Sequence, residues 1–551
     1  MKNKTGSFVW ARQWNIDWKL LLFLLLFLNV KLLVKIAAII LICILRRDLK
    51  FGFRLKDSRL PLFYLLAIAI AVFNWLTGGR INDINYGLVA LTGIFFWVLC
   101  IFAAHQVKLS VEQNEPTIIH RTIVIFFIIN ALVSLVVYTG IVWETGRMNP
   151  YLYQGNYQKY FIGTGDYIKG ITFDTSTTNA VLNAFGVIYF LFRGKNMLVL
   201  LCMAVLLLTG SNMTNLILCA TLIFVFFFQS GKIQKSMIII CLTMLAIFLV
   251  KISPQNNRYV ANAYQRLFNK NSGSGTTTTN NIPITLRHDS TLTNEEKKRK
   301  TAQRYMDSVS LLVFEKKQKE SLTKLGSLSI TGLNEKRVIP KDSIHTPRFQ
   351  HVNDTTAIEK ELMTFVNENP GDVPLAAGKK SGQALPGKIA ALQQTFEYFK
   401  EHPWKILTGT GIGNFSSKLA FRGTGLKVAG GYPKRFTYIN NDFKSNHLDL
   451  YLYYFTNKDD YHSITNSPNS AYDGLISEYG LAGLFSFAAF YIGFFVKQVK
   501  KHAYAIPLLL FMLGIFFIEY WFEQLSVVIF FELLVLLNIK ETTLTWSHET
   551  T

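Results

Sequence analysis

Long apolar runs recur along almost the whole of this chain. The runs at 84–105, 118–143 and 472–496 each hold more than the roughly 20 residues that a helix needs to cross the hydrocarbon core of a bilayer. Half of the sequence, 50% of 551 residues, is hydrophobic. Backbone polar groups have no water to bind inside a bilayer, so such segments form helices. We therefore expect an all-α polytopic membrane protein.

Several of the apolar runs are shorter than a full crossing, which is usual for helices packed inside a bundle. The expected spans lie near residues 60–77, 84–105, 118–143, 178–192, 197–209, 215–228, 236–250, 472–496, 504–520 and 523–539.

The first apolar stretch, 20–45, is interrupted near its middle by Asn29 and Lys31, and basic residues flank it at both ends. A single long helix would place Lys19 and Arg46 on opposite sides of the membrane. Two short half-spans that turn near Asn29 keep both charges on one side, and we favour this arrangement. It brings the total to about 12 spans, with both termini cytoplasmic.

Charge in the connectors predicts the orientation. Counting spans places four basic connectors on one side, and Lys and Arg collect in cytoplasmic loops. These connectors are 46–59, 193–196, 229–235 and 497–502. The connectors 77–85, 209–215 and 519–524 fall on the outer side and are short or nearly neutral. The segments 144–178 and 251–471 fall on the outer side as well.

The chain divides into three regions. We expect a first transmembrane bundle over 1–250, a large extracytoplasmic loop over 251–471, and further membrane helices with a short cytoplasmic tail over 472–551. A loop this long is functional or disordered in most proteins. Its segment 269–281 is rich in Gly, Ser, Thr and Asn and should be flexible.

Two stretches of this loop, 295–325 and 385–404, have apolar residues at helical spacing on a charged background. Both are predicted to be amphipathic helices. The second has Pro386 near its start and Pro403 just past its end, which mark helix boundaries.

Net charge and cysteine usage narrow the possible partners. The formal net charge of +22 suits anionic partners such as lipid headgroups or phosphates, whereas no basic, aromatic-interleaved patch indicates nucleic acid. The five cysteines all lie in apolar runs, so no disulfide framework is expected in the large loop. His447, Asp449 and His462 do not form a convincing ligand cluster, and we expect neither a metal nor another cofactor.

Two motifs flank the polar end of the large loop. The first reads EHPWKILTGTGIGNF over 401–415, and the second reads PNSAYDGLISEYGLAGL over 468–484 as the chain enters a span. The glycines of the first motif lack the spacing of a dinucleotide fingerprint and make either a structural turn or an anion-binding turn. The order, spacing and sidedness of the two motifs resemble the O-antigen ligase and O-antigen polymerase superfamily, which includes protein O-oligosaccharyltransferases.

This resemblance implies a metal-independent glycosyltransferase of the bacterial inner membrane with its large loop in the periplasm. The donor would be a glycan on undecaprenyl pyrophosphate. The acceptor would be a hydroxyl of lipid A-core, of another lipid-linked repeat or of a protein. Transfer would proceed by displacement at the anomeric carbon.

Loss of a pyrophosphate leaving group calls for cations that stabilise the growing negative charge. Lys388 stands where the resemblance implies an arginine, so it would bind pyrophosphate as a point charge. Arg422 and Arg435 in the large loop, and Arg147 and Lys169 in the smaller outer segment, are further candidates.

The acceptor hydroxyl has to lose a proton, so a positioned base is expected. The resemblance implies a histidine at the position that Asn469 occupies, and an amide orients a hydroxyl but is no base at neutral pH. Three other candidates for the base are left open: His462, His447, and Glu478 at the edge of the membrane span.

Two other functions compete with transfer. A flippase for the same lipid-linked glycans would line many spans with polar and charged residues, whereas ionisable residues are sparse in these spans. A sensor or assembly scaffold would carry a soluble cytoplasmic output domain, and the sequence indicates none. Glycan transfer at the outer face of the membrane is therefore the leading hypothesis.

Overall fold

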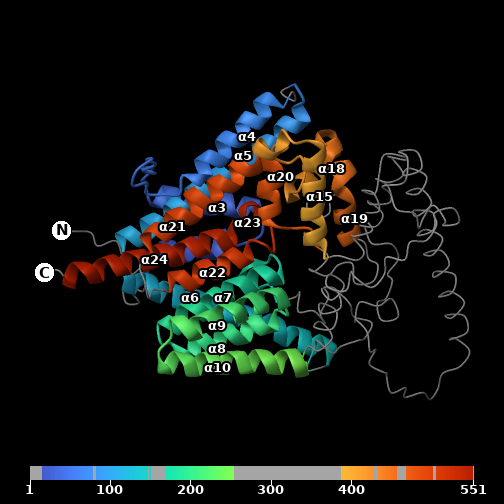
Figure 1. The fold of residues 1–551 in the computed structure, drawn as a ribbon. Coiled ribbons are helices and arrows are strands. Elements are labelled where there is room, and N and C mark those ends of the chain that lie inside the picture. The colour runs from blue at the N-terminus through green and yellow to red at the C-terminus, as the bar shows by residue number, and fades with distance from the viewer. Residues whose placement is uncertain are drawn as a thin grey trace, which may run out of the picture.

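The computed structural model describes residues 15–78, 82–146, 148–149, 168–252, 386–425, 432–455, 467–499 and 504–549. All regular elements among these residues are helices (Figure 1). The predicted flexible segment 269–281, the predicted helix 295–325, Arg147 and His462 lie outside the described residues.

The described residues form nineteen α-helices. In the first part of the chain they are α2 (Trp18–Phe27), α3 (Leu32–Leu45), α4 (Phe63–Thr77), α5 (Ile84–Gln113), α6 (Pro116–Thr145), α7 (Ser176–Phe192), α8 (Asn196–Leu208), α9 (Asn212–Phe228) and α10 (Lys232–Ile247). In the second part they are α15 (Gly387–Glu401), α16 (Lys405–Thr408), α17 (Lys418–Gly423), α18 (Asn441–Asn446), α19 (Leu448–Phe455), α20 (Ala471–Phe487), α21 (Gly493–Gln498), α22 (Ala505–Ile515), α23 (Trp521–Gln524) and α24 (Ser526–Glu549).

Four helical stretches within the described ranges are long and apolar enough to cross a bilayer. They are 84–113, 116–144, 232–252 and 471–498. Shorter apolar helices of 10–17 residues, α2, α3, α4, α7, α8, α9 and α22, accompany them. Length and composition therefore support a helical membrane protein, as the apolar runs predict.

The central helices of the bundle are α7 and α24. Every residue of α7 from Ser176 to Leu191 is buried, and the hydrophobic residues of α24 between Val527 and Leu537 are buried as well. Helix α24 contacts α5, α6, α7 and α22, while α7 to α10 pack together along one side of it (Figure 1). Because α7 is buried on every side, it forms part of the core of the bundle.

The interrupted stretch 20–45 forms a hairpin, as Asn29 and Lys31 predict. Helix α2 ends at Phe27, helix α3 begins at Leu32, and the two helices pack against each other. Lys19 Nζ donates to the carbonyl oxygen of Leu45 over 3.1 Å, so the two basic ends of the stretch meet.

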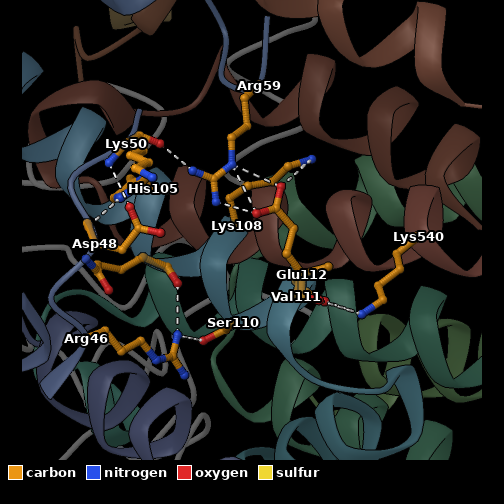
Figure 2. Close-up of polar contacts among 11 residues, drawn as sticks. Arg46, Asp48, Lys50, Arg59, His105, Lys108, Ser110, Val111, Glu112 and Lys540 are labelled. Carbon is orange, nitrogen blue, oxygen red and sulfur yellow. Dashed lines mark hydrogen bonds and ion pairs between the residues drawn. The ribbon is translucent and has the colours of Figure 1, made fainter. Parts of the chain in front are cut away.

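One end of the bundle gathers charged side chains from three connected segments (Figure 2). Arg46, which follows α3, forms a buried ion pair with Asp17 at 2.6 Å. Arg59 pairs with Glu112 at the end of α5. Lys540 of α24 donates to the carbonyl oxygens of Val111, Glu112 and Asn114 over 2.6–3.1 Å, which satisfies carbonyls that the end of α5 leaves without partners.

Further contacts bring other basic connectors to this end. Arg193 forms an ion pair with Glu541 near the end of α24, and Gln234 Nε2 donates to the carbonyl oxygen of Leu191 over 3.5 Å. The connectors 46–59, 193–196 and 229–235 therefore lie at one end of the bundle. The connector around Asn85 lies at the other end, where Asn85 Nδ2 donates to the carbonyl oxygen of Thr437 over 3.0 Å.

Lys540 makes the end of α5 sensitive to a single substitution. Replacing Lys540 with Met keeps most of the aliphatic length but removes three hydrogen bonds to carbonyls of α5. We expect the free energy of unfolding to fall by about 1–2 kcal/mol. Thermal unfolding of the purified protein measures this change. The exposed Lys497→Met serves as control, and an equal effect of both variants would contradict the capping role.

Candidate active site

A glycine-rich turn at 409–415 wraps around the carboxylate of Glu478. The backbone N–H of Gly413 donates to Glu478 Oε2 over 2.8 Å, and that of Phe415 donates to Oε1 over 3.1 Å. Two more N–H groups of the turn, those of Thr410 and Gly411, donate to the carbonyl oxygens of Ser477 and Glu478 over 2.9 and 3.0 Å. The turn is thus an anion-binding loop whose anion is a side chain of the same chain.

Glycine is required where the turn meets α20. Gly409 has φ +79° and Gly480 has φ +65°, both in the left-handed region. A Cβ on Gly409 would lie 2.4 Å from the Glu478 backbone, and one on Gly480 would lie 2.4 Å from the Leu407 carbonyl oxygen. Helix α20 kinks at Gly480, so the two backbones approach each other without side chains between them.

The two sequence motifs are therefore one structural unit. Both oxygens of Glu478 accept backbone N–H groups, and the side chain is only 2% exposed. These bonds give Glu478 a structural role, whereas a role as base remains a prediction. The glycine turn was predicted to be either a structural turn or an anion-binding turn. Its N–H groups bind an internal carboxylate, so it is an anion-binding turn with a structural role.

A second buried carboxylate joins the loop helices to α20. Asp473 accepts a hydrogen bond from Thr395 Oγ1 of α15 over 2.7 Å and another from Ser416 of the turn. Ser416 is 3.1 Å from the Tyr520 hydroxyl, which accepts from Tyr451 of α19 over 2.9 Å. This network fixes α15, the turn, α19 and the segment before α23 relative to the start of α20.

Lys388, Asn469 and Glu519 lie close to this network. We call these three residues the polar cluster. Lys388 of α15 is only 4% exposed, and its Nζ donates to the carbonyl oxygen of Ser467 over 3.1 Å. Asn469 Nδ2 donates to Glu519 Oε1. Burial lowers the pKa of Lys388 to about 8, and the nearby Glu519 carboxylate opposes that shift.

A small cavity lies behind the turn, between α5, α20 and α23. Its volume is about 40 Å³, room for about three waters at roughly 10–15 Å³ each. Glu478 and Glu523 both line it, and Oε2 of Glu523 has no hydrogen-bond partner among the described residues. Glu478 and Glu523 therefore face the same small space from α20 and α23. The cavity is far smaller than a sugar site.

The other predicted site residues are dispersed. Arg422 lies half-buried on α17, where its charge acts on Glu523. Arg435 is exposed, with its guanidinium 4.5 Å from the ring centroid of Phe436. Lys169 is half-buried directly before the short helix at 170–172 that leads to α7.

His447 lies at the junction of α18 and α19 and is fully buried. Its ring packs 5.5–6.2 Å, between centroids, from those of Phe415, Phe443 and Tyr451. This aromatic packing favours a structural role for His447. Of the predicted residues that the structure describes, only Lys388 and Asn469 share one cluster.

Sequence reasoning missed the acidic residues Asp473, Glu519 and Glu523. Counting spans treats 519–524 as a short, nearly neutral connector, yet it holds two carboxylates within five residues after an apolar run. Carboxylates at the edge of a span are unusual enough to be a signal. Within the described ranges, no group of three or more His, Cys, Asp or Glu side chains is placed to hold a metal ion.

No family model, curated protein or solved structure matches this chain.

Replacing Glu478 with Ala tests the anchoring of the turn. The variant leaves the buried N–H groups of Gly413 and Phe415 without an acceptor, and we expect a loss of about 3 kcal/mol in unfolding free energy. Thermal unfolding in nanodiscs measures it, with the exposed Glu401→Ala as control. An unchanged midpoint for Glu478→Ala would show that the turn is held by other contacts.

Proposed function

We propose that this protein is a membrane glycosyltransferase of the O-antigen ligase or polymerase type. It moves or polymerises a glycan from undecaprenyl pyrophosphate onto an acceptor hydroxyl at the periplasmic face of the bacterial inner membrane. The observation that carries the proposal is the polar cluster. A buried cation, an amide and a carboxylate converge from separate segments at the start of the apolar stretch 471–498.

The depth of the cluster suits a lipid-linked donor. Asn469 lies two residues before α20, which enters a stretch long and apolar enough to cross the bilayer. The pyrophosphate of a polyprenyl donor sits at the headgroup level, where such a helix begins. A desolvated Lys388 binds an anion there more strongly than an exposed lysine would, because the effective dielectric is low.

Lys388 supplies the fixed charge, and the other cations complete the electrostatic field in this proposal. Arg422, Arg435, Lys169 and Arg147 would attract the anionic donor or bind the distal glycan. The reaction needs only positioning, charge stabilisation and a proton acceptor, so no cofactor enters the scheme.

The proposed topology places the basic end of the bundle in the cytoplasm, as the positive-inside rule directs. The polar cluster, α15–α19 and the rest of the 251–471 loop then face the periplasm, in an arrangement of about 12 spans. Lys540 contacts the last turn of α5 and Asn85 lies in its first turn, so they mark opposite ends of the bundle, which supports this orientation.

A flippase for lipid-linked glycans is the alternative. It predicts charged groups along a path through the bundle. Two ionisable side chains inside the described part of the bundle make internal bonds instead. Lys35 donates to the Phe27 carbonyl oxygen and to Ser526 over 2.8 and 2.7 Å, and Glu532 accepts from Tyr64. These bonds favour a structural role and leave the polar cluster as the better candidate for function.

A deletion strain tests the function directly. Surface glycans and the lipid-linked pool are compared with those of the parent strain. A single repeat unit left on lipid A-core indicates a polymerase, and bare core with long chains on undecaprenyl pyrophosphate indicates a ligase. Loss of glycan from envelope proteins alone indicates a protein oligosaccharyltransferase. No change in any glycan would refute the transferase.

Substitution of Lys388 tests its charge. Lys388→Ala should lower transfer by roughly 10²-fold or more while the protein still inserts. In the wild type, kcat/KM for the donor should fall as the pH rises through about 8, because Lys388 loses its charge there. Lys388→Arg stays charged and should move that fall to higher pH. Wild-type transfer by Lys388→Ala would remove Lys388 from the site.

A further inference from the structure

The acidic residues around the polar cluster differ in whether their oxygens are already engaged. Glu478 accepts two backbone N–H groups, and Asp473 accepts two hydroxyl groups. Glu523 lines the small cavity of about 40 Å³ between α5, α20 and α23, and its Oε2 is buried. None of these three presents an accessible, unoccupied oxygen to an incoming substrate.

Glu519 differs from them. Its Oε1 accepts bonds from Asn469 Nδ2 and, over 3.2 Å, from the backbone N–H of Tyr520. Its Oε2 accepts no hydrogen bond from the described residues, although the side chain is only 6% exposed. One oxygen is thus fixed by donors and the other is left for a ligand.

The backbone around Glu519 is held on both sides. The N–H of Ala471 donates to the Phe516 carbonyl oxygen over 2.9 Å, which ties this segment to the start of α20. Trp521 is fully buried, and its Nε1 donates to the Ile515 carbonyl oxygen over 2.7 Å. These bonds hold the backbone in place, so the Glu519 carboxylate has a fixed orientation. Proton transfer requires such a fixed orientation.

Lys388 belongs to the same cluster as Glu519. Its Nζ donates to the carbonyl oxygen of Ser467, two residues before Asn469, whose Nδ2 donates to Glu519. The cation that would bind pyrophosphate therefore lies beside the carboxylate, as a displacement with donor and acceptor in one site demands. Asn469 lies between the carboxylate and the start of α20. An amide cannot take a proton at neutral pH, so in this cluster the proton acceptor has to be the carboxylate.

We propose that Glu519 is the general base of the transfer, an inference that rests on the proposed function. Glu519 Oε2 takes the proton of the acceptor hydroxyl while the hydroxyl oxygen forms a bond to the anomeric carbon. The bond between that carbon and the phosphate oxygen breaks, and its electron pair leaves on undecaprenyl pyrophosphate beside Lys388. Asn469 is a positioning residue that orients Glu519.

Isosteric substitution separates the base from its packing role. Gln in place of Glu519 keeps an oxygen that accepts from Asn469 and Tyr520 but is unable to take a proton. In nanodiscs, purified protein is supplied with an envelope lipid extract of the deletion strain, which contains donor and acceptor. Release of undecaprenyl pyrophosphate is followed by mass spectrometry. We expect Glu519→Gln to lower kcat by 10²- to 10⁴-fold, with KM for the donor and the melting midpoint unchanged.

Chemical rescue adds a readout that a structural role would not move. Glu519→Ala should be equally slow, and added formate should restore part of its rate by acting as a diffusible base. The surface variant Glu401→Gln is the control and should match the wild type with and without formate.

The outcomes separate this inference from the function on which it rests. Wild-type kcat for Glu519→Gln, or a slow Glu519→Ala that formate does not restore, would overturn the general base while leaving the transferase intact. Failure of the wild-type protein to release undecaprenyl pyrophosphate would overturn both.

Discussion

The insertion of the Glu478 carboxylate into the glycine turn is the interaction on which the arrangement of α15–α20 depends. A buried carboxylate is costly unless donors satisfy it, and N–H groups of a turn without side chains reach it at 2.8 and 3.1 Å. The bond is mutual. The turn gives Glu478 its partners, and Glu478 gives the turn its shape, so each motif would lose its conformation without the other.

Helices α15 and α19 are fixed to the bundle next to the glycine turn and Glu478. Asp473, one helical turn before Ser477, fastens α15 and Ser416 in the same way, and Tyr520 extends the network to α19. These bonds form a rigid hydrogen-bond network at the start of α20. Lys388, Asn469 and Glu519 lie beside this network, which sets the positions of the segments that carry them.

At the opposite end of the bundle, buried and half-buried charges are likewise satisfied by internal bonds. Arg46 forms an ion pair with Asp17. Arg59 pairs with Glu112, and Lys540 donates to carbonyl oxygens at the end of α5, so these basic residues also close helix ends (Figure 2). The basic residues named here therefore fall into two groups. Cations at the basic end are largely satisfied internally, whereas Lys388 is desolvated beside a carboxylate that has an oxygen to spare.

The sequence by itself determined the all-helical class with long apolar helices, the hairpin at Asn29 and Lys31, and the helix after Pro386. It also indicated Lys388 and Asn469 as candidate site residues, because they lie beside the two motifs. Those features follow from local periodicity, breakers and charge. Only the tertiary structure decided that Glu478 fills the glycine turn, that His447 is packed among aromatic rings, and that Glu519 meets Asn469. Glu519 and Asn469 are 50 residues apart, and Glu478 lies 65 residues after Gly413. No local pattern encodes such pairings, because they arise from how helices distant in sequence pack.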